Sequence, residues 1–273
     1  MLTEKMKNWF GGIRLTWPKV ILFAVIAGVY TAVMAIIPAL HYTSFHTIAV
    51  TFEVWILFGI LIIMNSQSSV DSALKCFVFF LISQPLVYLL QVPFSWQGWQ
   101  LFQYYKYWFI WTVLCLPMGY IGYFMKKNKW WGYLILLPMI LELAYSYMGY
   151  FSNLLFYFPK YILIVLFCAA TMMLYPLAIF DNKKIKWTGA VISAVLIVTV
   201  TVIGFLYPPV YSTYFLAAEV ADDTYEVCLE NSDYGDVAIV YDENLEEYMV
   251  HAQFKKAGDT TLTLTSPTGE KTT

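Results

Sequence analysis

The chain has 273 residues, of which 60% are apolar and only 12% are charged, and its mean hydropathy is +0.63. A soluble domain is about 45–50% apolar and about 25% charged, so this composition excludes an ordinary soluble globular protein. The net charge of −2 hides a split between the two parts of the chain. Residues 1–216 hold 13 Lys/Arg and 5 Asp/Glu, whereas residues 217–273 hold 3 and 13, which indicates two different environments.

Apolar stretches dominate the first three quarters of the chain. Each is roughly 18–21 residues long, and a helix of that length spans a hydrocarbon core of about 30 Å. The sequence therefore predicts an all-α polytopic membrane bundle of seven transmembrane helices over residues 1–207. The stretches are Val20–Leu40, Thr47–Met64, Ala73–Val92, Tyr107–Met125, Trp131–Met148, Tyr161–Phe180 and Trp187–Tyr207.

Basic residues between the stretches predict the topology. With the N-terminus inside, only Lys106 and Lys160 fall in outside loops, and the positive-inside rule favours this orientation. Seven crossings then place the C-terminus outside. No Asn-x-Ser/Thr sequence occurs, which favours a bacterial plasma membrane. The eleven basic residues of the inside segments are Lys5, Lys7, Arg14, Lys19, Lys75, Lys126, Lys127, Lys129, Lys183, Lys184 and Lys186.

Two acidic residues lie deep in the predicted spans, Glu53 and Glu142. Charge within a bilayer is costly, so such residues are functional candidates. Both lie about six residues from the outer end of their stretches, and with Gln84, His41 and His46 they could form a polar site that handles protons or a cation. Alternatively, each glutamate bonds to a nearby Tyr, Trp or Ser and only fastens the bundle.

Aromatic residues crowd the second outside loop, notably Trp96, Trp99, Tyr104 and Tyr105. One interpretation is an interfacial belt, in which amphipathic rings lie at the level of the lipid headgroups. The other is an outer aromatic surface on which a sugar or a lipid headgroup stacks.

A different pattern begins after a linker at residues 208–216. Apolar and polar residues alternate in Tyr225–Glu230, Asp236–Tyr241, Glu247–Lys255 and Thr260–Thr265, with turn residues between them. We expect a small antiparallel β module over residues 217–273, outside the membrane, whose size makes it marginal by itself. It would lean on the membrane loops, pair with a neighbour or form a partial immunoglobulin-like sandwich. Its acidic residues match no calcium-binding loop and disfavour nucleic acid as a partner.

No pattern for catalysis, a metal or a cofactor stands out. There is no phosphate-binding loop, no HExxH and no Gly-x-Ser-x-Gly, and the histidines and cysteines lack metal-ligand spacing. The sequence favours a non-enzymatic membrane component that contacts the lipid bilayer and presents residues 217–273 to a protein partner. The alternatives are a small transporter or ion-coupled carrier using Glu53 and Glu142, and an intramembrane enzyme acting on a lipid-linked or envelope substrate.

Overall fold

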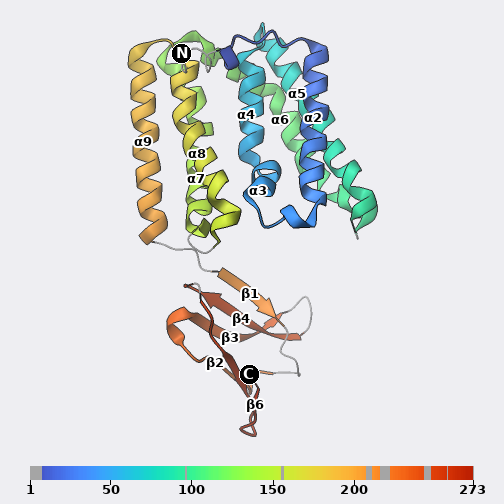
Figure 1. Ribbon diagram of the computed structural model, residues 1–273, viewed down its shortest axis with the longest axis vertical. Helices are drawn as coiled ribbons and strands as arrows, with labels where there is room; N and C mark the ends of the chain where they lie inside the picture. The colour runs from blue at the N-terminus through green and yellow to red at the C-terminus, as the bar shows by residue number, and fades with distance from the viewer. Residues whose placement is uncertain are drawn as a thin grey trace. The chain divides into compact units, whose positions relative to one another are not determined.

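The computed structural model describes residues 8–95, 97–154, 157–206, 211–215, 222–242, 247–256 and 258–272. The chain divides into two compact units, Met1–Ile203 and Gly204–Thr273. The first unit consists of helices and the second of short strands, which agrees with the change of pattern along the sequence (Figure 1).

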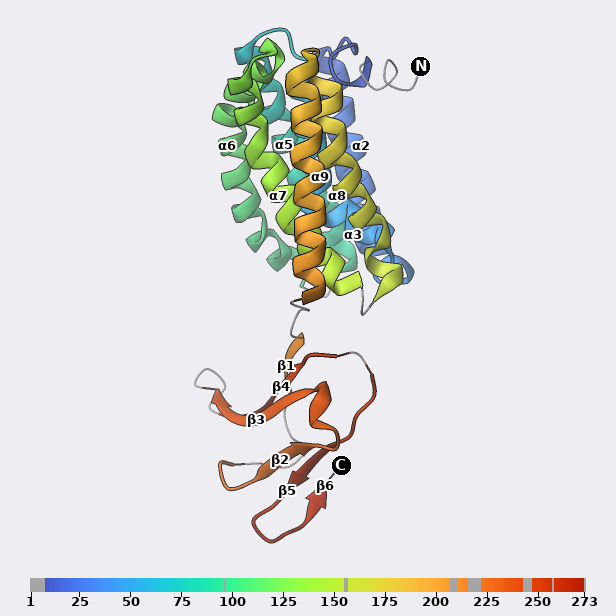
Figure 2. The ribbon, with the colours of Figure 1, turned by 90° about the vertical axis from the view of Figure 1, so that its left-hand side faces the viewer.

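Six helices of the described chain are long and apolar enough to cross a membrane, and a bent pair of shorter helices would make a seventh span. They overlap the predicted stretches and run side by side along the bundle (Figures 1 and 2). The chain is therefore a helical membrane protein by the length and composition of its helices. The six long helices are α2 (Trp17–Ile36), α5 (Ser69–Gln91), α6 (Tyr105–Gly122), α7 (Trp130–Leu154), α8 (Phe158–Ile179) and α9 (Lys183–Leu206).

The stretch Thr47–Met64 differs from the prediction, because it is not one straight helix. It contains most of α3 (Ser44–Val50) and all of α4 (Phe52–Met64), which meet at an angle of 54°. The break lies at Thr51, whose backbone is extended (φ −91°, ψ 159°). An extended residue interrupts the ladder of backbone hydrogen bonds, so the helix axis changes direction at Thr51, within an apolar stretch long enough to span a membrane.

Hydrogen bonds to a distant part of the chain hold α3 in its tilted position. The Ser44 hydroxyl donates to the Pro159 carbonyl at 2.8 Å, and the Thr47 hydroxyl donates to the Lys160 carbonyl at 3.1 Å. Both acceptors are in the first turn of α8, and the Leu163 amide of the same helix donates a hydrogen bond to the Ser44 hydroxyl at 3.2 Å. The bend therefore depends on contacts between residues more than a hundred positions apart.

Glycines allow close packing on both sides of α5. A Cβ added to Gly28 of α2 would lie 2.9 Å from the Ser83 carbonyl oxygen, and one added to Gly119 of α6 would lie 2.9 Å from Ala73 Cα. Small residues let helix backbones approach closely in membranes, where burying apolar surface gives little driving force. In the rest of the bundle α7 packs along α8, and α9 lies at the periphery (Figure 2).

Three segments are joined at the end of the bundle that is uppermost in Figure 1. The Asn65 side chain, after α4, accepts a hydrogen bond from the Ile13 amide at 2.8 Å. The Tyr123 hydroxyl, after α6, donates to the Gln67 carbonyl at 2.7 Å. The segment before α2, the α4–α5 loop and the chain that follows α6 therefore form one connected surface.

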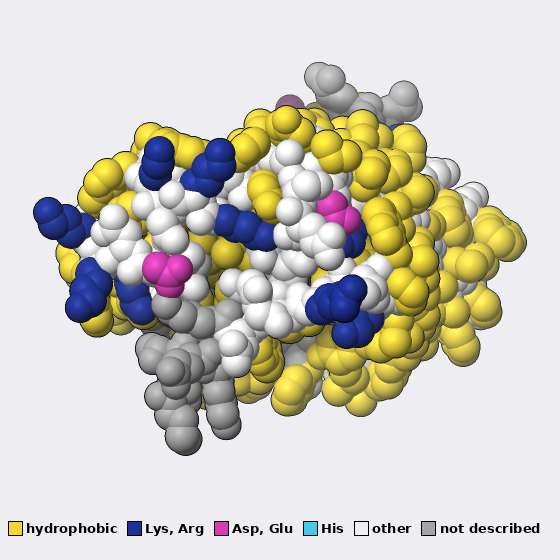
Figure 3. All heavy atoms as spheres, turned by 90° about the horizontal axis from the view of Figure 1, so that it is seen from above, with side chains coloured by type: hydrophobic (Ala, Val, Ile, Leu, Met, Phe, Trp, Pro, Cys, Tyr) yellow, Lys and Arg dark blue, Asp and Glu magenta, His cyan; other side chains and the backbone are white. Residues whose placement is uncertain are grey.

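Basic side chains gather on this end, which Figure 3 views from above. The α8–α9 loop joins it, because the Asn128 side chain accepts a hydrogen bond from the Asp181 amide at 2.7 Å. Lys106 and Lys160 lie at the starts of α6 and α8, at the opposite end of the bundle. Lys5 and Lys7 lie outside the described residues. The basic residues at the common end, or in the helix turns next to it, are Arg14, Lys19, Lys75, Lys126, Lys127, Lys129, Lys183, Lys184 and Lys186.

The second unit contains two antiparallel sheets of three strands each. One has the order β1-β4-β3 and the other β2-β5-β6. Strands β2 to β5 correspond to the four alternating segments of the sequence, whereas β1 lies within the segment predicted as a linker, 208–216. The strands are β1 (Tyr211–Phe215), β2 (Glu226–Leu229), β3 (Gly235–Asp242), β4 (Glu247–Phe254), β5 (Leu262–Thr265) and β6 (Lys271–Thr272).

The core of this unit is thin. Within its described residues the buried hydrophobic side chains are Val250 and Ala252 of β4 and Leu264 of β5. Val227 is opposite Leu264 in the strand register and adds a half-buried side chain. So little buried apolar surface provides only modest stability for a unit of this size.

Candidate functional site

Glu53 is buried in the first turn of α4 and is only 2% exposed. The Tyr150 hydroxyl of α7 donates a hydrogen bond to its Oε1 at 3.2 Å, and its Oε2 has no hydrogen-bond partner. Glu53 follows the break at Thr51 and lies in the first turn of α4, close to the first backbone N–H groups of that helix. The partial positive charge of these N–H groups favours a carboxylate at this place.

The polar residues expected to form one cluster have different partners among the described residues. His41 and His46 lie together between α2 and α4, with ring centroids 5.0 Å apart, and the His41 ring bonds the Ala35 carbonyl at 2.8 Å. Gln84 is buried in α5, and its Nε2 has no hydrogen-bond partner. Among the described residues, no hydrogen bond or salt bridge joins Glu53, Gln84 or Glu142 to one another.

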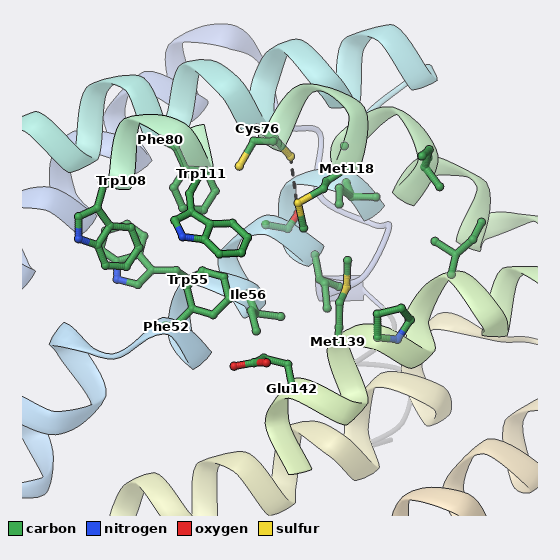
Figure 4. A pocket seen from close by; sticks show the side chains of 18 residues that line it. Phe52, Trp55, Ile56, Cys76, Phe80, Trp108, Trp111, Met118, Met139 and Glu142 are labelled. Carbon is green, nitrogen blue, oxygen red and sulfur yellow. Dashed lines mark hydrogen bonds between the residues drawn. The ribbon is translucent and has the colours of Figure 1, made fainter. Parts of the chain in front are cut away.

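A pocket of about 360 Å³ lies between α4, α5, α6 and α7 (Figure 4). This volume is in the range of small-molecule sites, about 300–1,000 Å³. The α4 residues on its wall follow a helical spacing of three or four, so one face of that helix is turned to it. The lining residues are Phe52, Trp55, Ile56, Gly59, Ile60, Ile63, Cys76, Phe80, Trp108, Trp111, Cys115, Met118, Gly119, Ile121, Ile135, Pro138, Met139 and Glu142.

Glu142 is the single ionisable carboxylate on this wall. Figure 4 shows its carboxylate pointing from α7 toward Phe52 and Ile56 of α4. Within the described chain it makes no salt bridge and no hydrogen bond. It therefore places one carboxyl group without a described partner in a pocket whose remaining lining is apolar or aromatic.

Tryptophans and phenylalanines form much of the wall near this carboxylate. The Phe52 ring lies 6.3 Å from the Trp108 ring and 5.4 Å from the Trp111 ring, measured between centroids. Trp55, 5.9 Å from Phe80, is buried behind them. The pocket is thus lined by aromatic rings, and the electron-rich face of such a ring attracts positive charge.

The pocket is open along α6 and α7. Trp111 and Ile121 of α6 are 45% and 51% exposed, and Pro138 and Glu142 of α7 are exposed as well. Trp111, Pro138 and Glu142 lie within the inner parts of helices that are long enough to span a bilayer, and Ile121 lies near the end of α6. In a membrane this opening would face the lipid, so apolar molecules could enter from the bilayer.

The outer aromatic residues lie near the start of α6. Trp99 and Phe102 stack with centroids 5.7 Å apart, and Tyr105 lies 6.3 Å from Phe102. Trp99 and Tyr104 are exposed. Trp96 lies outside the described residues. The exposed rings are compatible both with an interfacial belt and with a surface for stacking.

Sequence reasoning singled out Glu142 but missed the pocket beside it and the role of Tyr150. One signal for the pocket was present, because Phe52, Trp55, Ile56 and Gly59 share one helical face that combines large rings with a glycine. A glycine there leaves open space, since a Cβ on Gly59 would meet no atom within 4 Å.

No group of three or more His, Cys, Asp or Glu side chains in the described chain is arranged to hold a metal ion. Comparison with protein-family models, with curated proteins and with solved structures gives no match for this chain. Its function has to be inferred from the residues themselves.

Proposed function

We propose that this chain is an integral membrane protein that binds a small apolar molecule in the pocket between α4 and α7. The observation that carries this proposal is the cavity itself, about 360 Å³, lined almost wholly by apolar and aromatic side chains. Binding is the common role of a large apolar pocket with one polar group. A carrier that moves such a molecule is one form of this function.

The proposal includes seven spans, with the N-terminus inside and the β unit outside, in the plasma membrane of a bacterium. Counting the bent pair α3–α4 as one span supports the seven crossings. The gathering of lysines and arginines at one end supports the orientation, because cytoplasmic loops are rich in these residues. The absence of Asn-x-Ser/Thr sequences supports the bacterial assignment.

Two matched leucine variants test whether the pocket holds a molecule. A Cβ added at Gly59 or at Gly149 meets no atom within 4 Å, but only Gly59 lines the pocket. Gly59→Leu should fill the cavity, and Gly149→Leu should add the same side chain on α7 outside it. Both variants should fold, because neither new side chain begins with a clash.

The measurement is native mass spectrometry of the protein extracted gently from its own membrane. We expect a bound small molecule or lipid on the unchanged chain and on Gly149→Leu, and its loss from Gly59→Leu. An unchanged chain without a bound molecule, or Gly59→Leu that keeps the same molecule, would contradict the proposed function.

A second candidate function is the presentation of the β unit to a protein partner. It is supported by aromatic side chains on the sheet β1-β4-β3: Tyr211, Tyr214 and Tyr241 are 66%, 55% and 51% exposed. Tyr214 lies on β1, which is an edge strand, and its ring stacks on the His251 ring at 4.3 Å. Edge strands and exposed tyrosines are common contact points for partner proteins.

A further inference from the structure

We infer that the molecule bound between α4 and α7 carries a positively charged nitrogen, an amine or a quaternary ammonium on an apolar body, and that Glu142 is its counter-ion. This inference rests on the proposed function, because it specifies the ligand class of the same pocket. The inference concerns the charge of the ligand, which the cavity-filling variant Gly59→Leu does not test by itself.

The first argument is the unpaired charge of Glu142. Its carboxylate points into the α4 side of the pocket, and no cationic side chain of the described residues pairs with it (Figure 4). No lysine, arginine or histidine lines the cavity. A carboxylate at membrane depth is costly without a partner, so a ligand that supplies a cation would gain the missing interaction.

Aromatic rings form the part of the wall that Glu142 points toward. Phe52 of α4 lies within 6.3 Å of both Trp108 and Trp111 of α6, and the carboxylate of Glu142 points toward Phe52. Tryptophan faces bind cations best, and aromatic cages with a nearby carboxylate suit ammonium groups. An anionic ligand would be repelled by a carboxylate at Glu142, and the lining contains no positively charged side chain to bind it.

The third argument concerns the apolar body of the ligand. Away from Glu142 the pocket is lined by aliphatic and sulfur-containing side chains such as Ile60, Ile63, Met118 and Met139. The thiol of Cys76 is directed to the Gly59 carbonyl at 3.9 Å, so this group already has a partner within the protein. A hydrophobic skeleton with one charged end therefore matches the pocket better than a sugar or a nucleotide.

The test uses three probes that share one hydrocarbon cage and differ in a single polar substituent, which is cationic, neutral or anionic: 1-adamantylamine, 1-adamantanol and adamantane-1-carboxylate. The full chain is reconstituted in lipid nanodiscs at neutral pH, where an aliphatic amine is protonated and a carboxylic acid in water is ionised. Equilibrium dialysis measures each Kd, and binding to protein-free nanodiscs is subtracted. Glu142→Gln, which keeps the shape of the side chain, and Gly59→Leu are measured in parallel.

We expect the amine to bind the unchanged chain about tenfold more tightly than the alcohol, with the carboxylate weakest. Glu142→Gln should bring the amine and the alcohol to within about twofold of each other without weakening the alcohol. Gly59→Leu should weaken all three probes. Glu270→Gln, which removes a carboxylate from the separate β unit, should leave all three affinities unchanged.

Two results would overturn the inference in distinguishable ways. If the amine and the alcohol bind equally and Gly59→Leu weakens both, the pocket is a binding site but Glu142 is not a counter-ion. If no probe binds, or if Gly59→Leu changes none of the affinities, the proposed function fails together with the inference.

Discussion

Gly119 is the position where a single methyl group should loosen the bundle. Its Cβ in a Gly119→Ala variant would lie 2.9 Å from Ala73 Cα and 3.1 Å from the Ser72 carbonyl oxygen, both in the backbone of α5. The backbone atoms of α5 cannot rotate away as a flexible side chain can, so α6 must move away from α5. The movement also strains the hydrogen bond from the Ser72 hydroxyl to the Gly119 carbonyl, now 2.8 Å long.

The expected magnitude combines three effects. Overpacking of this kind costs about 1–3 kcal/mol. Weakening the Ser72 hydrogen bond costs about 1 kcal/mol, and replacing a helical glycine by alanine returns about 1 kcal/mol. Gly119→Ala should therefore lower the free energy of unfolding by about 1–3 kcal/mol.

The controls are Gly59→Ala and Gly149→Ala, because neither new Cβ meets an atom within 4 Å. Each should be unchanged or more stable by up to about 1 kcal/mol through helix propensity alone. Thermal unfolding of the purified variants in one detergent measures the differences. If Gly119→Ala is as stable as Gly149→Ala, α5 and α6 do not pack as closely as described, and the reasoning is refuted.

Two further predictions concern other parts of the chain. The Lys75 side chain is 3% exposed and its ammonium pairs with Asp71 at 2.6 Å, so Asp71→Ala should destabilise the bundle by about 3–5 kcal/mol in chemical unfolding. Adding Lys75→Met should restore most of that loss, and a double variant as unstable as Asp71→Ala would contradict the pairing. If the β unit contacts a partner, a photo-crosslinking amino acid at the exposed Tyr214 should give one discrete protein adduct in the native membrane. The same group at exposed Trp187 of α9 should not give that adduct, and an identical adduct from both positions would argue against a contact through β1.

Hydropathy alone determined where the long helices lie. A span needs about 20 mostly apolar residues whatever its neighbours are, so the signal is local and survives without tertiary information. The same holds for the strands β2 to β5, whose alternation of side chains follows from the two-residue repeat of a strand. β1 was missed because Tyr-Ser-Thr-Tyr-Phe at Tyr211–Phe215 follows two prolines and has no clear alternation.

Only the tertiary structure decided how the polar residues and the pocket are arranged. The bend at Thr51 depends on hydrogen bonds from Ser44 and Thr47 to the first turn of α8, and Glu53 meets Tyr150 across 97 positions of the chain. The pocket needs four helices, and its existence depends on their distances and rotations. A periodic pattern reports which face of a helix is apolar, but not which helix that face meets or whether side chains fill the space between them.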